Sequence, residues 1–428
     1  MHNNTIQKSV RIALIGIIVV SLGLLGWWYF FLKSETRSQR IIDTARGLDI
    51  SAPEFTSSGG STYLNLVHSI PSVPLWRSVQ DATKKAVQPF VFFREEENET
   101  SRPRLWHASA LPTAGMAFTT AGGTTTLRFV ERATGNVLEA HVGTRAVSRL
   151  TNTLVPWVKE ALFAGERVFL RGIEDGTLIT KTGVVISSSS AKSLVSNELE
   201  ERILSLAISP SGDTISYLAP DGNGGVALML ASANGGNKKR IATFGTRDWT
   251  VYYANKDRII VATRPADNVV GHAYDATTPN KIVPVVRNIP GLTIAIHASS
   301  SAILYGASEK GKLSLYVQKS SVDEPALLPL STIAEKCAFA PSGSVAYCAV
   351  PHGNTDSEFL NRWYRGETHT SDVWWEINVE LGTAKQLFDP GIEEGFLIDA
   401  EVPVVSDDGA YLAFRNAQDW SLWVLSLR

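Results

Sequence analysis

Short turns rich in Ser, Gly and Asp recur along this chain, and each leads into a run of apolar and aromatic residues. A turn followed by such a run is typical of a β-hairpin entering its second strand. Five successive turns are anchored at 164, 209, 254, 297 and 340, which are 43 to 45 residues apart. Because a four-stranded propeller blade has about this length, the period predicts an all-β propeller of about seven blades. The copies are Ser209–Pro220 (SPSGDTISYLAP), Ala340–Pro351 (APSGSVAYCAVP), Ser406–Arg415 (SDDGAYLAFR), His297–Gly306 (HASSSAILYG) and, more weakly, Ala254–Thr263 and Ala164–Arg171.

The repeats also predict later strands and one enlarged blade. Third strands are expected at Val226–Ala231, Leu313–Gln318, Val373–Val379 and Ser421–Leu427. The interval from 340 to 406 is 66 residues, about 22 more than a blade needs. We assign the extra residues to an insertion at 352–372.

The last blade runs out of chain after its third strand, at Arg428, so its sheet needs a fourth strand from elsewhere. Our candidate is Phe90–Phe93 in QPFVFFRE, because the preceding Pro89 suits the first position of a strand. A seventh hairpin is expected near Leu111–Phe118. The two ends of a propeller spanning 89–428 are thus predicted to meet in one blade.

The SPSG, APSG and SDDG turns resemble the S-P-D-G hairpins of TolB-like, WD-repeat-like propeller repeats. The resemblance covers roughly 100–428, although Ser211 and Ser342 replace the usual Asp. It implies a fold and not a chemistry, since such propellers serve in binding, scaffolding and catalysis. The segment Asn361–Leu387 also resembles an inserted blade in membrane-anchored propeller proteins of bacteria, and this likeness implies no activity.

Ile12–Leu32 contains 21 residues without a charge. As a helix it would span roughly 31 Å, the thickness of a bilayer's hydrocarbon core. Trp27, Trp28 and Tyr29 favour the membrane interface at its end. The alternative is a cleaved signal peptide, but no small-residue cleavage site follows. We therefore predict a tail at 1–11, a single transmembrane helix at 12–32 and a linker or stalk at 33–88.

The only cysteines, Cys337 and Cys348, share one predicted hairpin, KCAFAPSGSVAYC. A turn centred on Ser342-Gly343 places them directly opposite each other, where Cα atoms about 4.5–5.5 Å apart suit a disulfide. The equivalent pairs in other blades are Leu206 with Tyr217, Ile294 with Tyr305 and Pro403 with Phe414. A disulfide implies an oxidising compartment and an N-in, C-out anchor, although the basic residues flanking the anchor favour the opposite orientation. Two buried thiols are the alternative.

Composition and motifs do not indicate catalysis. Apolar residues make up 44% and charged residues 19% of the chain, as in a globular protein, and a net charge of −2 argues against nucleic-acid binding. Gly306–Leu313 (GASEKGKL) lacks the Ser or Thr of a phosphate-binding loop. The eight histidines are scattered singly and show no metal-ligand spacing. We expect no catalytic residue, no cofactor and no metal site.

The insertion contains the clearest functional candidates, Trp363, Tyr364 and Arg365, in a polar stretch that the blade does not need. These residue types dominate binding hot spots, so they could form a partner surface. The alternative is that Trp363 and Tyr364 fold back as a cap over the neighbouring blade.

The leading functional hypothesis is a membrane-anchored, extracytoplasmic propeller that binds a protein of the cell envelope or a ligand, or acts as a scaffold, without catalysis. The alternative is a propeller enzyme of the lyase or glycan-hydrolase type with its site in the central funnel. A third possibility is a purely structural domain.

Overall fold

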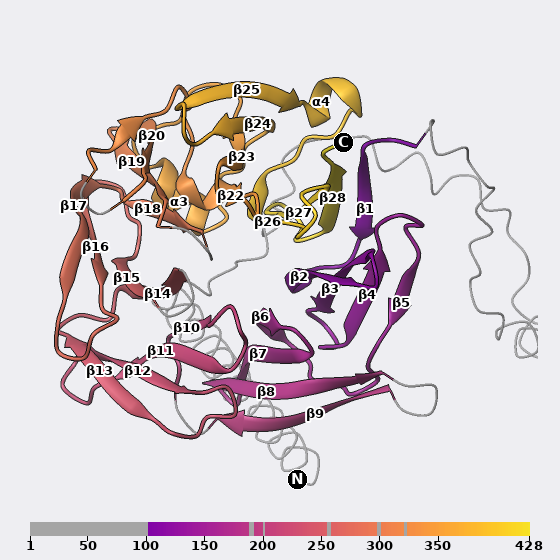
Figure 1. Ribbon diagram of the computed structural model, residues 1–428, viewed down its shortest axis with the longest axis vertical. Helices are drawn as coiled ribbons and strands as arrows, with labels where there is room; N and C mark the ends of the chain where they lie inside the picture. The colour runs from indigo at the N-terminus through magenta and orange to yellow at the C-terminus, as the bar shows by residue number, and fades with distance from the viewer. Residues whose placement is uncertain (1–101, 188–191, 200–201, 255–257, 298–300, 321–322) are drawn as a thin grey trace, which may run out of the picture. The chain divides into compact units, whose positions relative to one another are not determined.

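The computed structural model describes residues 102–187, 192–199, 202–254, 258–297, 301–320 and 323–428. Within these ranges, seven four-stranded antiparallel sheets form a ring in which each sheet is one blade (Figure 1). The first strand of each blade lies nearest the centre. The prediction of an all-β propeller of about seven blades is confirmed.

The chain forms the blades in sequence order, and each of the first six is a four-stranded meander. Blades 1 to 3 consist of β2 (Thr113–Ala121), β3 (Thr124–Glu131), β4 (Val137–His141) and β5 (Val147–Arg149); of β6 (Val158–Ala164), β7 (Arg167–Glu174), β8 (Thr177–Ser187) and β9 (Lys192–Leu199); and of β10 (Ser205–Ile208), β11 (Thr214–Pro220), β12 (Val226–Ser232) and β13 (Lys239–Phe244). Blades 4 to 6 consist of β14 (Trp249–Ala254), β15 (Arg258–Thr263), β16 (Val270–Asp275) and β17 (Val283–Pro290); of β18 (Thr293–Ile296), β19 (Ile303–Glu309), β20 (Lys312–Gln318) and β21 (Ala326–Leu327); and of β22 (Cys337–Phe339), β23 (Val345–Pro351), β24 (Asp372–Asn378) and β25 (Thr383–Phe388). The short helices are the 3-10 helix η2 (Ala334–Lys336), α3 (Phe359–Tyr364) and α4 (Pro390–Glu393).

Blade 7 joins the two ends of the ring. Its strands β26 (Ala400–Val405), β27 (Tyr411–Asn416) and β28 (Leu422–Ser426) are completed by β1 (Leu105–Ser109), which pairs with β28. An N-terminal strand does close the last sheet, but the prediction that Phe90–Phe93 supplies it is wrong. The closing strand lies later because Leu105, Trp106 and Ala108 of β1 are buried between blade 7 and its two neighbours.

The recurring turns connect the first and second strands of each blade, as predicted. Gly212, Gly343 and Gly409 occupy them with φ of 77°, 73° and 65°, in the left-handed region that favours glycine. The hairpin expected near Leu111–Phe118 is wrong: the turn of blade 1 lies at Gly122-Gly123, between β2 and β3. Both glycines have positive φ, so this tight turn needs none of the Ser or Asp residues that marked the others.

The strand assignments and most of the register agree with the sequence. The four predicted third strands are β12, β20, β24 and β28, each within one residue at either end. Cys337 pairs with Cys348, Leu206 with Tyr217 and Ile294 with Tyr305. The register predicted from Pro403 and Phe414 holds at Val404–Ala413 and Val405–Leu412, but Pro403 itself lies in a bulge between Glu401 and Val404 and forms no ladder pair. Proline has no N–H to donate to a strand ladder, so a bulge, where the ladder is interrupted, accepts it.

Hydrophobic side chains on the two faces of each sheet pack against the two neighbouring blades. Leu304 and Leu315 of blade 5 share a buried cluster with Ile377 of blade 6. Between blades 6 and 7, the rings of Trp374 and Phe414 lie 5.0 Å apart. The core is therefore a series of interfaces around the ring, and each inner strand is held by both neighbours.

Among the described residues, no helix has the length and apolar character to cross a membrane. The predicted tail at 1–11, the anchor at 12–32, the stalk at 33–88 and the segment Phe90–Phe93 lie outside the residues described.

Candidate functional site

The insertion at 352–372 leaves blade 6 after β23, folds over the ring and leads into β24. In the view of Figure 1, its helix α3 is drawn on the inner side of blades 5 and 6. Phe359, Leu360 and Trp363 of this helix are buried in one cluster with Leu313 and Ile333. The apolar face of α3 therefore packs on residues of blade 5 and of the connection between blades 5 and 6.

Polar contacts extend this cover to blades 4 and 5. The Asn361 amide N–H donates to Asp267 Oδ2 at 2.9 Å, and Asn361 Oδ1 accepts from the Asp267 N–H at 3.2 Å. Asp267 follows β15 in blade 4. The Thr355 hydroxyl donates to the Gly311 carbonyl in blade 5. The insertion thus contacts three adjacent blades at one end of the ring.

The three candidate partner residues are placed differently. Trp363 is only 9% exposed, and the Tyr364 hydroxyl donates to Glu335 Oε2. The side chain of Arg365 is 42% exposed and forms an ion pair with Glu367 at 2.7 Å. Trp363 and Tyr364 therefore act as the cap that the sequence left open as an alternative, and Arg365 alone of the three lies on the surface.

Lys336, the last residue of η2, is completely buried beneath this cap. Its ammonium group is enclosed by oxygen atoms, and Nζ lies 5.0 Å from the centre of the Trp363 ring, within the range of a cation–π interaction. The oxygen contacts are Asp399 Oδ1 at 2.5 Å, Asp372 Oδ2 at 2.6 Å, Thr370 Oγ1 at 3.0 Å and the Ala400 carbonyl at 3.0 Å.

Asp399 connects these groups. Besides Lys336, its carboxylate accepts hydrogen bonds from Trp363 Nε1 and from the Thr370 hydroxyl, and His369 Nδ1 lies 3.0 Å from Oδ2. Burial works against both charges, but the two carboxylates outweigh it and hold the pKa of Lys336 above its usual value. At Asp399, burial raises the pKa, but the nearby charge of Lys336 outweighs it and holds the pKa of Asp399 well below its usual range. The group is thus a buried, charged network that joins η2, the insertion and blade 7, and in it Asp372 Oδ1 makes no hydrogen bond to the described residues.

Glu335 precedes Lys336 but belongs to a different cluster, at the inner edge of the ring. It is partly buried, and its one hydrogen bond in the described part of the chain comes from Tyr364. Burial raises the pKa of Glu335 to about 7; the tyrosine lowers it and the nearby carboxylate of Glu401 raises it further. A carboxyl group in this state exchanges its proton near neutral pH.

Tyr252 of β14 and Arg264 at the end of β15 extend this cluster to blade 4. Burial, with Glu335 as the second cause, raises the pKa of Tyr252 above its usual value. Burial lowers the pKa of Arg264, while Asp248 raises it. Burial and then Glu335 raise the pKa of Tyr364 as well, so both tyrosines stay neutral around the glutamate.

Two arginine–glutamate pairs, one in blade 2 and one in blade 7, lie near this cluster. Arg171 forms an ion pair with Glu160 of β6 and donates to the Ile203 carbonyl at 2.8 Å. Arg415 forms one with Glu401 of β26 at 2.6 Å. Ionisable groups from blades 2, 4, 6 and 7 therefore converge toward the centre of the ring, together with Tyr364 of the insertion. We name Glu335, Tyr364, Tyr252 and Arg264 the central cluster.

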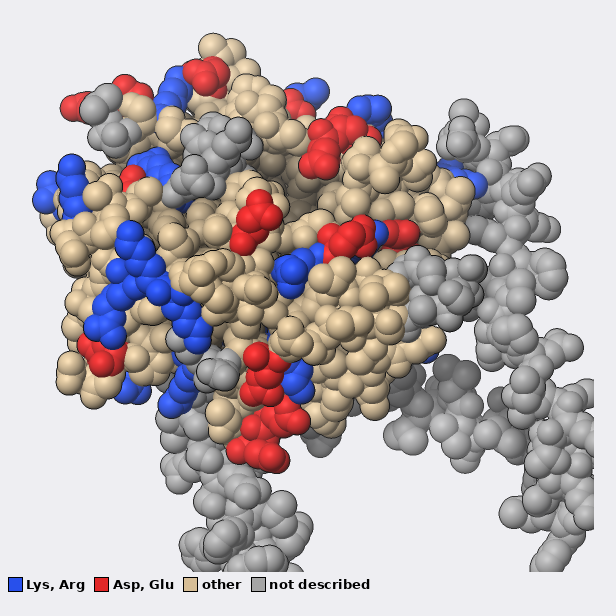
Figure 2. Space-filling model, turned by 60° about the horizontal axis from the view of Figure 1, so that its bottom comes forward, with Lys and Arg blue, Asp and Glu red and all other residues tan. Residues whose placement is uncertain are grey.

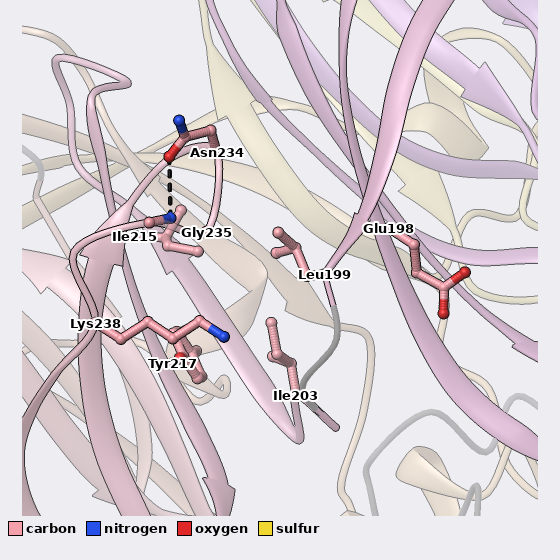
Figure 3. Close-up of a pocket in the computed structure, with 9 residues that line it drawn as sticks. Glu198, Leu199, Ile203, Ile215, Tyr217, Asn234, Gly235 and Lys238 are labelled. Carbon is pink, nitrogen blue, oxygen red and sulfur yellow. Dashed lines mark hydrogen bonds between the residues drawn. The ribbon is translucent and has the colours of Figure 1, made fainter.

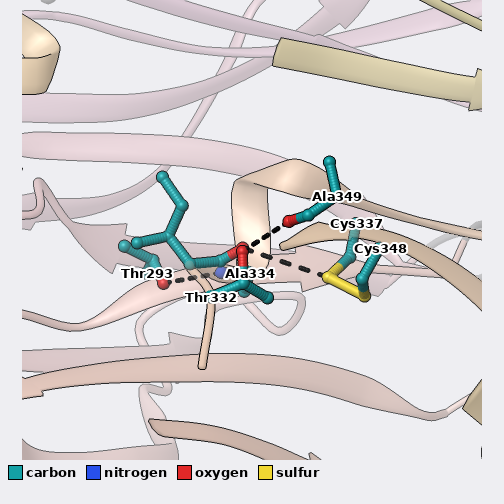
Figure 4. The surroundings of a disulfide bond; sticks show 7 residues. Thr293, Thr332, Ala334, Cys337, Cys348 and Ala349 are labelled. Carbon is teal, nitrogen blue, oxygen red and sulfur yellow. Dashed lines mark hydrogen bonds between the residues drawn. A yellow bond between two sulfur atoms is a disulfide. The ribbon is translucent and has the colours of Figure 1, made fainter. Parts of the chain in front are cut away.

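A disulfide between Cys337 and Cys348 fixes the segment that carries Glu335 and Lys336 (Figure 4). The two Cα atoms are 4.1 Å apart, on β22 and β23. On the other side of η2, the Ala334 N–H donates to Thr293 Oγ1 at 2.9 Å, which links it to blade 5. η2 is thus anchored to both adjoining blades.

The described residues contain no group of three or more His, Cys, Asp or Glu side chains arranged to hold a metal ion. On the face shown in Figure 2, acidic and basic side chains occur in small groups of both signs. The central cluster therefore remains the candidate functional site.

A cavity of about 320 Å³ lies between blades 2 and 3 (Figure 3). Leu199, Ile203, Ile215 and Tyr217 are its apolar lining, and Asn234 and Lys238 are among its polar lining residues. Glu198 points away from this group (Figure 3). The four wall residues belong to the buried cluster between these blades, so packing of the blades accounts for them. The volume is at the low end for a ligand pocket.

Sequence reasoning missed Glu335, Lys336, Tyr252 and Asp399, which match no motif and come from η2, from blade 4 and from the connection to blade 7. One signal was present: Glu-Lys directly before Cys337 places two charged residues at the start of an inner strand, where neighbouring blades bury the chain. Buried charges need partners, and that requirement would have directed attention to them.

No protein-family model matches this sequence, and no curated protein does. Among solved structures, an oligogalacturonate lyase in complex with manganese has a TM-score of 0.45 at 12% identity, covering 74% of this chain and 97% of that one. TolB from Acinetobacter baumannii has a TM-score of 0.41 at 11% identity, and the match covers 72% of this chain and 65% of TolB. The Cps50 (Swd1) β-propeller domain of Myceliophteria thermophila has a TM-score of 0.48 at 10% identity, and the match covers 75% of this chain and 99% of that domain. These similarities extend to the propeller fold alone.

Proposed function

We propose that this chain is a membrane-anchored binding and scaffold module, and that its binding site is the end of the ring covered by the insertion. The observation that supports this most is the way the insertion is fastened. A segment that blade 6 does not need is held over the centre by Trp363, through Asp399 and Lys336. Such a fixed surface suits recognition, since little order has to be gained on binding.

The outer side of the cap offers side chains for a protein partner in the cell envelope. The side chains of Arg362 and Arg365 are 39% and 42% exposed, and each pairs with a carboxylate of the insertion itself, Asp356 and Glu367. Arginine is enriched in binding hot spots. Of the partner surface proposed from the sequence we therefore keep Arg365, and we add the outward-facing Arg362.

A pull-down from intact membranes tests this surface. The double variant Arg362→Ala, Arg365→Ala should reduce the enrichment of the partner at least about tenfold, the loss expected for about 1.4 kcal/mol of binding energy. Arg149→Ala, on the exposed outer strand β5 of blade 1, is the matched control and should retain the partner. An unchanged set of partners with the double variant would remove this surface from consideration.

We place the propeller outside the cytoplasm because its cysteines are paired, and disulfides persist in oxidising compartments. In intact cells, a membrane-impermeant protease should then degrade the propeller. Protection of the propeller until the membrane is opened would favour a cytoplasmic location instead.

A second candidate function is acid–base catalysis at the central cluster, of the lyase or glycan-hydrolase type. The observation that favours it is the contact between Tyr364 and Glu335, whose pKa of about 7 suits proton exchange at neutral pH. An assay for cleavage products from acidic and neutral glycans tests it. Activity should be lost in both Glu335→Gln and Tyr364→Phe; activity that persists in both variants excludes this site.

A further inference from the structure

Glu335 differs from the other charged groups near the centre of the ring because no basic side chain contacts it in the described part of the chain. Its carboxylate is partly buried, keeps some exposed surface and accepts from Tyr364. A carboxylate that loses water without gaining a cation is costly to ionise. The site is therefore electrostatically incomplete when Glu335 is charged.

The arginines nearby are already matched to other carboxylates. Arg415 pairs with Glu401 at 2.6 Å, and Arg171 pairs with Glu160. Asp248 is the carboxylate that acts most strongly on Arg264. Two of these arginines thus form ion pairs, the charge of Asp248 acts on the third, and Glu335 adds a fourth carboxylate.

The underside of the insertion adds a further negative charge. Asp267 is buried, and the hydrogen bonds to its carboxylate come from neutral groups, the Asn361 N–H at 2.9 Å and the Ser308 hydroxyl at 3.3 Å. Its charge acts on Tyr364, the residue that contacts Glu335. An anion approaching Glu335 would meet the carboxylates of Glu335 and Asp267, neither of which forms an ion pair within the described residues, whereas a cation would be attracted to them.

We propose that the central cluster receives one cationic group, a guanidinium or alkylammonium, which pairs with Glu335 between Tyr364 and Tyr252. This inference rests on the proposed function, because it specifies the chemistry received at the same end of the ring. The carboxylate supplies the charge, and the neutral tyrosines supply hydroxyl acceptors and rings that a cation can contact. A guanidinium is favoured by its weaker hydration and its planar fork of donors.

Calorimetric titration of the purified full chain with n-butylguanidinium chloride tests the site, with sodium butyrate as the anionic comparison. The guanidinium should bind at least about tenfold more tightly than butyrate at pH 8. Because Glu335 has a pKa of about 7, its ionised fraction rises from roughly a tenth at pH 6 to roughly nine tenths at pH 8, so the affinity should rise about tenfold over this range. N-acetyl-arginine amide serves as the second probe, and tighter binding of it than of butylguanidinium would assign the cation to a protein side chain.

Glu335→Gln keeps the shape of the side chain and removes its charge. In this variant the guanidinium affinity at pH 8 should fall at least about tenfold and its pH dependence should disappear. Glu380→Gln, on an exposed turn of blade 6, is the matched control and should behave as the unmodified chain. Near-UV circular dichroism confirms that each variant is folded.

The possible results separate the two proposals. Unchanged guanidinium binding in folded Glu335→Gln, or equal binding of butyrate, would overturn the cation site even if the insertion variant loses its protein partner. Loss of guanidinium binding in Glu335→Gln, together with an unchanged pull-down for the double arginine variant, would keep the cation site and overturn the proposed partner surface.

Discussion

The indole Nε1 of Trp363 donates to both carboxylate oxygens of Asp399, each at 3.0 Å. This contact connects the insertion of blade 6 to the connection that enters blade 7. Because the same carboxylate binds Lys336 and Thr370, one side chain fixes three separate segments. The position of the cap over the ring therefore depends on a residue outside the insertion.

Asp399→Asn should destabilise the propeller strongly, because Lys336 would keep its buried charge with one carboxylate fewer. We expect a loss of about 3–5 kcal/mol in the free energy of unfolding, the range for breaking a buried ion pair. Urea denaturation measures it, with the exposed turn residue Asp407→Asn as control. Equal midpoints for both variants would show that Asp399 is not structurally important.

Lys336→Met removes the cation and leaves Asp372 and Asp399 buried together. Without it, the folded-state pKa of Asp399 should rise above the unfolded value of about 3.9, and the pKa of Asp372, which burial already raises, should rise further. The folded variant then binds protons more tightly than the unfolded chain. The variant should therefore gain stability as the pH falls from 7 to 5, relative to the unmodified chain. Denaturation midpoints at the two pH values test this, and a constant difference between the proteins would contradict it.

Glu335 should make the stability of the propeller decrease as the pH rises. Its folded-state pKa, raised to about 7 chiefly by burial, lies above the ordinary value of 4.5, so folding favours the protonated form. The free energy of unfolding should fall between about pH 4.5 and pH 7, by about 2 kcal/mol after allowance for partial exposure. Glu335→Gln should flatten this part of the pH profile; an identical profile in the variant would show that another group causes the slope.

Reduction of the disulfide should lower the thermal stability. The cysteines are 11 residues apart in sequence, and closing a loop of this size stabilises a fold by about 2–3 kcal/mol in the chain-entropy account. The midpoint should fall on addition of reductant, whereas the double variant Cys337→Ala, Cys348→Ala should not respond to reductant. Free thiols in freshly isolated protein would contradict the pairing.

The fold was predictable because its information is local and repeated. Each hairpin places a polar turn before a buried second strand, so the spacing of turns such as Ser209–Gly212 revealed the blades, and the register of Cys337 followed from its own turn. The Gly122-Gly123 turn escaped because two glycines with positive φ need no polar partner. β1 escaped because its pairing partner, β28, is more than 300 residues away in sequence.

The central cluster was not predictable in the same way, because its four residues lie on separate segments of blades 4 and 6. Glu335 and Lys336 are adjacent in sequence, yet one contacts Tyr364 and the other contacts Asp399. Which neighbour enters which cluster depends on the rotation of η2 between two blades. The unusual composition around Trp363 was visible in the sequence, but its inward direction follows from the apolar surface of Leu313 and Ile333 beneath α3.

The closure of blade 7 also determines when the ring can be completed during synthesis of the chain. β1 is among the first propeller segments to leave the ribosome, and its hydrogen-bonding partner β28 is the last strand. Until synthesis passes Ser426, the strand edges and side chains that blade 7 later covers have no partner, and unpaired edges invite association with other chains. A chaperone would thus have most reason to bind this protein until β28 has been synthesised.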